Sequence, residues 1–164
     1  MAIARRVAQY LQQQGIGYRL VDHPHTQSAL QSARSAGVPP AQTAKAVVLQ
    51  DHQGHLVMAV IPAAHRLLLG KLQRELECTL SLLPERALAD LFDDCEVGAV
   101  PATGDPYHLT VVYDESLLSG GDLYLEGGDH CHLLQVPATA VPQLFHRAHH
   151  GRFSAPPRPD YGLH

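Results

Sequence analysis

The sequence is poor in cysteine, and the three that it has, Cys78, Cys95 and Cys131, form no CxxC pair. An odd count without close spacing argues against a disulfide framework, and none of the three carries the local signature of a nucleophile. The N-terminus also shows no signal peptide. These absences favour a reducing setting, so a cytoplasmic location is expected.

Long apolar runs and runs of basic residues are missing as well. No apolar segment is long enough to cross a bilayer, so no membrane partner is expected. Lysine and arginine number 12 against 16 acidic residues, which gives a formal net charge of -4. This balance argues against a strong, sequence-independent nucleic-acid binder. It still allows contact with one charged end of an RNA through a few groups.

The 164 residues, 45% of them hydrophobic, predict one folded domain with a real core. Strands and helices follow one another without regular βαβ alternation, so the fold class is predicted as α+β with a mixed sheet. The domain is expected to span residues 1–150, and residues 151–164 to form a loose, proline-rich tail. Periodicity and turn residues predict helices at 3–11, 28–36, 64–76, from 84 onward and 141–148, and strands at 18–21, 45–50, 56–61, 79–82, 108–113, 123–125 and 131–136. A helix cap is expected at Thr26.

Lys45 stands where a lysine is unusual, at the start of the apolar stretch 44–49. In a strand Lys45 shares a face with Val47 and Leu49, while Ala46 and Val48 make the other face apolar too. The stretch therefore predicts a strand covered on both sides. A buried, unpaired ammonium is costly, so Lys45 either reaches water at the end of the strand or lines a cleft.

Two further features could carry chemistry. The loop 98–104 is rich in glycine and proline, and its backbone N–H groups could stabilise a developing oxyanion. An ordinary helix-to-strand connection is the alternative for this loop. Asp114 ends a predicted strand, where a carboxylate either caps the following turn or faces a cleft.

The twelve histidines suggest a metal site only weakly. His130 and His132 lie two residues apart, as do His23 and His25, so each pair would share one face of a strand. A closed zinc site needs four ligands, and no HExxH or CxxC motif supplies the others. No metal and no other cofactor are expected. A histidine-rich metal-binding protein remains as an alternative, beside the two functions considered below.

Several segments occur in an order that resembles the YbaK/EbsC family, the editing domains associated with prolyl-tRNA synthetase. The resemblance runs from about Tyr18 to Phe145 and rests on the ordered combination of its segments. Those segments are His25-Thr26, the helix ending near Gly37, Lys45 opening an apolar strand, the leucine-rich helix at 67–76, Cys95-Glu96-Val97-Gly98-Ala99-Val100-Pro101 and Val112-Tyr113-Asp114-Glu115-Ser116-Leu117.

This resemblance implies a mixed sheet that forms a partly closed barrel, with helices outside and one cleft. Family members hydrolyse the ester of mischarged aminoacyl-tRNA, which releases a small, wrongly attached amino acid. By the resemblance Lys45, Gly98 and Asp114 would be the catalytic positions. Substrate-binding positions would be Thr26, Ala46, Ala99, Val100, Pro101, Gly128 and His130. The implied partners are the aminoacylated acceptor end of tRNA and an aminoacyl-tRNA synthetase.

The main hypothesis is therefore an aminoacyl-tRNA deacylase acting in trans. Ala46, Ala99, Ala102 and Thr103 depart from residues that are common in the family. These departures support the alternative of an inactive module that uses the same cleft to bind an aminoacyl group, a nucleotide or a small ligand for regulation.

Overall fold

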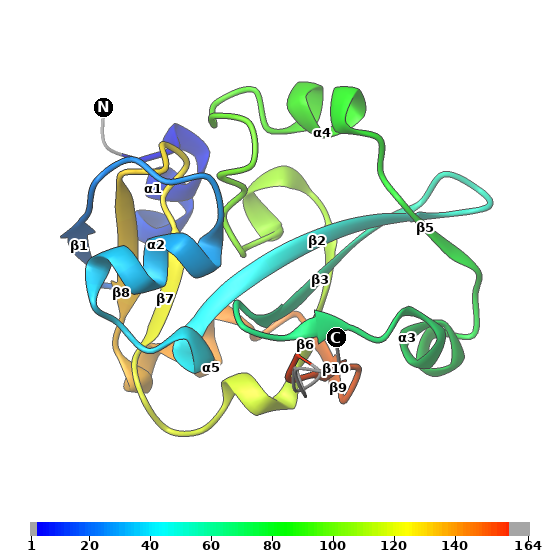
Figure 1. Cartoon of the computed structure of the whole chain (residues 1–164). Helices are drawn as coiled ribbons and strands as arrows, with labels where there is room; N and C mark the ends of the chain where they lie inside the picture. The colour runs from blue at the N-terminus through cyan, green and yellow to red at the C-terminus, as the bar shows by residue number, and fades with distance from the viewer. Residues whose placement is uncertain (1–2, 158–164) are drawn as a thin grey trace, which may run out of the picture.

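The computed structural model describes residues 3–157, which form α-helices and strands around a mixed sheet (Figure 1). The α-helices are α1 (Arg5–Gln13), α2 (Ala29–Ala36), α3 (Leu69–Leu76), α4 (Glu85–Leu91) and α5 (Val141–Leu144). The strands are β1 (Arg19–Asp22), β2 (Thr43–Asp51), β3 (Leu56–Pro62), β4 (Arg66–Leu67), β5 (Leu80–Leu82), β6 (Thr110–Asp114), β7 (Leu123–Glu126), β8 (His132–Val136), β9 (His149–Gly151) and β10 (Ser154–Ala155). The predicted α+β class with a mixed sheet is confirmed.

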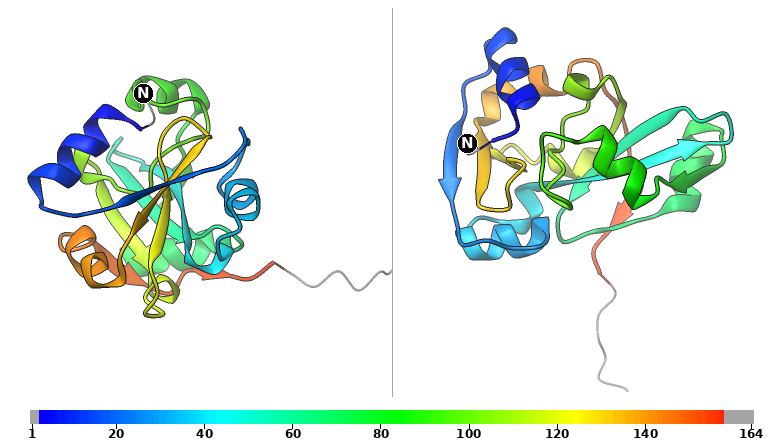
Figure 2. Two further views of the ribbon diagram at one scale, coloured as in Figure 1. Left: turned by 90° about the vertical axis from the view of Figure 1, so that its left-hand side faces the viewer. Right: turned by 90° about the horizontal axis from the view of Figure 1, so that it is seen from above.

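Eight strands form one sheet in the order β1-β8-β7-β2-β3-β6-β9, with β5 added beside β2. The pairs β2·β3, β2·β5, β7·β8 and β1·β8 are antiparallel, whereas β2·β7, β3·β6 and β6·β9 are parallel. Figure 2 shows the helices around the outside of these strands. In the described part of the chain β1 and β9 are the two edges, and no pairing between them closes the sheet into a barrel.

The β2 strand is covered on both faces, as the sequence predicts. Ala44 and Val48 belong to a large core cluster that also contains residues of α1, β7 and β8. Leu49 belongs to a second cluster on the other face, together with Ile61 and Phe153. Lys45 therefore lies in a strand that has apolar layers on both sides.

Two helices begin later than predicted. Ser28, not Thr26, caps α2: its hydroxyl accepts a hydrogen bond from the Gln31 N–H. The helix expected at residues 64–76 begins only at Leu69, because Arg66 and Leu67 form the short strand β4. The leucine spacing predicted the helix correctly, but it could not show that the first residues of the predicted segment form a strand paired with β10.

The C-terminal strap (residues 149–155) is part of the fold, contrary to the expected loose tail. The helix expected at residues 141–148 ends at Leu144, and β9 then pairs with β6. Phe153 is fully buried, and β10 pairs with β4. A sequence rich in proline and glycine does not reveal this, because the strap consists of two very short strands around a single aromatic anchor. The rest of the predicted tail, residues 158–164, lies outside the described residues.

Within residues 3–157 no helix is both long and apolar enough to cross a membrane.

Candidate functional site

A hollow of about 200 Å³ brings together residues that are distant in the sequence. It contains four of the predicted site residues, which are Lys45, Ala46, Gly98 and Val100. Its other lining residues are Gln27, Ser28, Ala29, Leu88 and Glu126. The hollow thus lies between the start of α2, the middle of β2, α4 with the loop that follows it, and the end of β7.

Lys45 is half-buried, and its Nζ donates a hydrogen bond to the carbonyl oxygen of His65 at 2.9 Å. An ammonium group has three donors, so this bond leaves two for a ligand. Burial lowers the pKa of Lys45 from its usual value, because desolvation disfavours the charged form. His65 is itself held by the C-terminal strap, since its Nδ1 lies 2.9 Å from the Ser154 hydroxyl.

Ala46 contributes its backbone to the site. The Thr43 carbonyl accepts a bond from the Ala63 N–H on the β3 side, and the Val48 carbonyl accepts one from the Leu83 N–H on the other side. Because peptide groups alternate along a strand, the N–H and C=O of Ala46 face the same edge as those of Val48. On that edge β7 pairs with residues 43–44 and β5 with residues 49–51. The Ala46 peptide therefore faces the interval between two strands.

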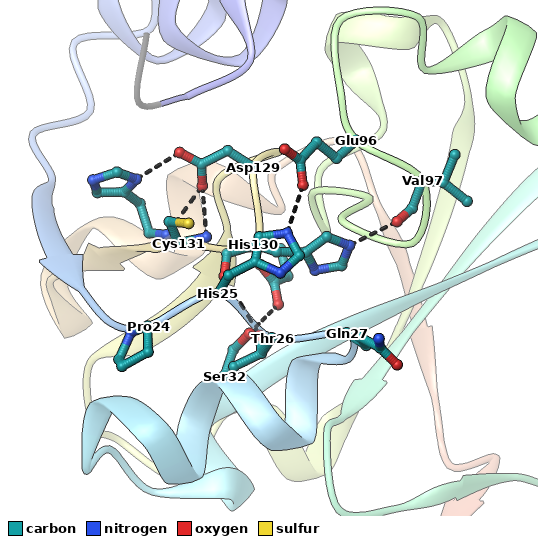
Figure 3. A network of polar contacts seen from close by, with 12 residues as sticks. Pro24, His25, Thr26, Gln27, Ser32, Glu96, Val97, Asp129, His130 and Cys131 are labelled. Atoms are coloured by element: carbon teal, nitrogen blue, oxygen red, sulfur yellow. Dashed lines mark hydrogen bonds and ion pairs between the residues drawn. The ribbon is translucent and has the colours of Figure 1, made fainter.

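Gly98 occupies a position where a side chain is strongly disfavoured. Its φ of +83° lies in the left-handed region, and a Cβ there would lie 3.4 Å from the His130 Nε2 atom. The same His130 nitrogen lies 2.6 Å from the Val97 carbonyl, to which it donates its proton (Figure 3). The loop is thus fixed by the imidazole on one side and leaves its backbone exposed to the hollow.

Two other predicted residues, Thr26 and His130, do not line the hollow but form hydrogen bonds that join the segments around it. The Thr26 N–H donates to the His130 carbonyl at 3.1 Å, and its hydroxyl lies 2.6 Å from that of Ser32 (Figure 3). The Gly128 carbonyl accepts a 2.7 Å bond from the N–H of Glu96, next to the loop. Ala99 is buried, and Pro101 is buried too; neither lines the hollow. These residues lie outside the lining of the hollow and support the loop, and their binding role stays a prediction.

Asp114 does not line this hollow. Its Oδ1 accepts bonds from the backbone N–H and the hydroxyl of Ser116, and its Oδ2 accepts a bond from the Phe153 N–H at 2.9 Å. It caps the following 3-10 helix, as one of the two sequence interpretations proposed. Burial alone would raise the pKa of Asp114, but the hydrogen bonds from Ser116, Phe153 and Ser154 outweigh it, and the pKa is lowered. The carboxylate holds the C-terminal strap on the sheet.

Replacing Asp114 with alanine is expected to lower the free energy of unfolding by about 2–4 kcal/mol, because buried donors lose their acceptor. Urea unfolding measures this, with Asp90→Ala on the exposed side of α4 as a control that makes the same substitution away from the strap and is expected to cause no such loss. Because the pKa of Asp114 is lowered on folding, its contribution is present above the unfolded-state pKa and is lost as the pH falls through the folded-state pKa. The alanine variant should therefore lose less stability than the wild type on acidification. Unchanged stability would contradict the anchoring role.

The two histidine pairs meet at one ring contact, in which the centroids of His25 and His130 lie 5.4 Å apart, but their other contacts diverge. His132 contacts Asp129 and Asp22, whereas His130 contacts Val97. His23 uses its Nδ1 on the Pro24 carbonyl. In the part of the chain that the structure describes, no group of three or more His, Cys, Asp or Glu residues is arranged to hold a metal ion.

Glu126 is the important lining residue that the sequence analysis missed. It is 2% exposed at the end of β7, and its Oε1 accepts a 2.6 Å bond from the Ser32 hydroxyl. The signal that identified Lys45 was also present here, since Glu126 is a charged residue in the apolar strand 123–126. Its neighbours Gly127 and Gly128 made the segment look like an ordinary turn. Gln27, Ser28, Ala29 and Leu88 carry no comparable signal.

Comparison with solved structures places this fold among known ones. It is similar to a hypothetical protein with a TM-score of 0.79 and 22% identity, covering 92% of this chain and 100% of the other. A protein described as a proposed trans-editing enzyme for prolyl-tRNA synthetase has a TM-score of 0.79 and 25% identity, covering 93% and 96%. A protein from Marinobacter aquaeolei VT8 provisionally assigned to signal transduction has a TM-score of 0.76 and 20% identity, covering 92% of this chain but 30% of that longer one.

A search of curated proteins found no significant match. The model of the aminoacyl-tRNA editing domain family, however, matches residues 23–143, which include every residue that lines the hollow. This match covers most of the chain and agrees with the resemblance of the sequence to editing domains. The chain belongs to the aminoacyl-tRNA editing domain family.

Proposed function

We propose that this protein is a trans-editing aminoacyl-tRNA deacylase, which hydrolyses the ester of a mischarged tRNA that carries a small amino acid. The observation that carries the proposal is the hollow itself, which is lined by Lys45, by Gly98 and by Ala46 on the unpaired part of the β2 edge. Membership of the editing-domain family supports it. So does the similarity to a proposed trans-editing enzyme.

The chemistry needed is the attack of water on the ester carbonyl. Negative charge then develops on the carbonyl oxygen, and preorganised donors around that oxygen accelerate the reaction. The Lys45 ammonium and the backbone of the Gly98 loop are the donors proposed for it. As the tetrahedral intermediate collapses, the bond to the tRNA ribose oxygen breaks and that oxygen takes up a proton. With a cysteinyl substrate, the thiol of the substrate could attack in place of water.

A small aminoacyl group is proposed because the hollow measures only about 200 Å³. Ala29, Leu88 and Val100 give it apolar sides. A second recess of about 90 Å³ shares Leu88, Gly98 and Val100 with it and is lined further by Phe92. A synthetase pocket rejects a smaller amino acid by only ~10–200-fold per methylene, so a separate hydrolytic site for small residues has a clear use.

The partners proposed are the acceptor end of an aminoacylated tRNA in the cytoplasm and a synthetase that delivers it. The net charge of -4 fits contact with a short terminal segment rather than with a long stretch of RNA. The partly closed barrel implied by the resemblance also remains a proposal, since its edges β1 and β9 are unpaired with each other in residues 3–157.

The test is a deacylation panel with Cys-tRNA(Pro), Ala-tRNA(Pro), Ser-tRNA(Ala) and Ser-tRNA(Thr), and with Pro-tRNA(Pro) as the correctly charged control. We expect the wild type to release at least one small amino acid ~10–200-fold faster than proline, the range that pocket size can provide. Loss of acid-precipitable radioactivity from the tRNA measures the rate. If a well-folded protein released none of them, the deacylase proposal would fail and a binding module would replace it.

A further inference from the structure

Glu126 has a carboxylate that the protein leaves half-satisfied. Its Oε1 is held by the Ser32 hydroxyl, which uses its only proton for this bond, so the Thr26 hydroxyl must donate to Ser32. The other oxygen, Oε2, is buried and has no hydrogen-bond partner within the described residues. Glu126 lines the hollow, so this already oriented carboxylate lies at its wall.

The described residues also leave this carboxylate without a cationic partner. Glu126 takes part in no salt bridge there, and the nearest imidazoles, His130 and His23, each use one nitrogen on a backbone carbonyl. Burial raises the pKa of Glu126, and the Ser32 hydroxyl with the two imidazoles offsets this only in part. A buried carboxylate is costly unless it is paired, so a small cation entering the hollow would relieve that cost.

We propose that Glu126 binds the α-ammonium group of the aminoacyl moiety, so that the site takes esters with a free amine and rejects N-acylated ones. The inference rests on the proposed function. Every aminoacyl ester carries an ammonium group next to the ester carbonyl. A carboxylate on one wall and the Lys45 ammonium with the Gly98 loop on the others match the opposite charges of the amine and the developing oxyanion. A peptidyl or N-acetyl group removes the cation and leaves Glu126 buried and unpaired.

Binding and hydrolysis test this separately. The binding probes are 3′-deoxy-3′-(alanylamino)adenosine, whose amide cannot be released as an ester, and its N-acetyl derivative. The hydrolysis substrates are Ala-tRNA(Pro) and N-acetyl-Ala-tRNA(Pro). Each pair is compared in the wild type, in Glu126→Gln, which keeps the shape and the Ser32 contact, and in Glu77→Gln, an exposed control that makes the same change of charge.

We expect the wild type to prefer the free amine by about 10- to 100-fold, the usual value of a hydrogen bond to a charged group. In Glu126→Gln that ratio should fall toward one through loss of the free-amine ligand alone, and in Glu77→Gln it should not change. Equal losses for both members of a pair would identify a structural role and overturn the proposal. A wild type that binds the free-amine and N-acetyl analogues equally well would also overturn the proposal. A wild type that prefers the free-amine analogue but releases no amino acid would support Glu126 and refute the deacylase.

Discussion

Lys45→Ala is expected to lower kcat for ester hydrolysis by about 10²–10³-fold, the usual effect of removing one donor to an oxyanion. The ammonium lies in the hollow and has two donors free after its bond to the His65 carbonyl. Single-turnover deacylation of the substrate identified by the panel measures the loss. Activity within about threefold of the wild type would show that the site is assigned wrongly, since a lost catalytic donor costs far more.

Lys45 is expected to lower the free energy of unfolding while it supports catalysis. Burial lowers its pKa, so the folded state disfavours the ammonium form, and at neutral pH the charge destabilises the fold. Lys45→Met keeps the apolar stem without the charge, and we expect it to be inactive but at least as stable as the wild type in urea. Lys71, the only other lysine, is exposed on α3, and Lys71→Ala controls for the loss of positive charge with activity retained.

Gly98→Ala should lower kcat/KM by roughly 10- to 100-fold, because a misplacement of about 1 Å in a catalytic group can cost that much. The added methyl group would lie 3.4 Å from the His130 Nε2 atom and 3.7 Å from the Gln27 carbonyl, which are contact distances, so the positive φ rather than a clash is expected to displace the loop. The positive φ adds a strain of about 1–2 kcal/mol for any side chain. Steady-state kinetics and urea unfolding measure the two effects separately.

Gly54→Ala is a matched control for this change. Gly54 has a φ of +82°, almost that of Gly98, but a Cβ there would have no atom within 4 Å. It lies in the turn between β2 and β3, and we expect a similar loss of stability with activity unchanged. If both variants lost activity to the same extent, general destabilisation would explain Gly98→Ala, and the loop would have no special role.

The residues of the hollow that the sequence predicted are those whose side-chain type interrupts a regular pattern. A charge in an apolar strand marks Lys45, and glycine and proline mark the loop 98–104, within which the resemblance to the family singles out Gly98. The same argument applied to Glu126 would have identified it, but the two glycines that follow drew attention to a turn. The order of the strands decides which charged residues line the same hollow. The parallel pairing of β2 with β7 joins segments that are distant in the sequence, and the local residue pattern does not predict it.

The role of Ala46 could not be predicted from its side chain. What it offers is a peptide group, and this group faces the hollow only because β7 and β5 cover different parts of the same edge of β2. The sequence marks a strand at this place but not where its neighbours stop. Substitutions at position 46 therefore say less about the site than its departure from the family pattern suggests.

The C-terminal strap has a consequence for the order in which the protein is made. During synthesis residues 149–155 emerge from the ribosome after the other strands of the main sheet have been translated. Until they do, β6 lacks its outer neighbour, the space filled by Phe153 is open, and His65 lacks the Ser154 hydroxyl that holds it beside Lys45. A nascent chain can thus assemble most of its sheet early, whereas His65, which accepts the hydrogen bond of Lys45, gains its contact with Ser154 only when the strap has left the exit tunnel.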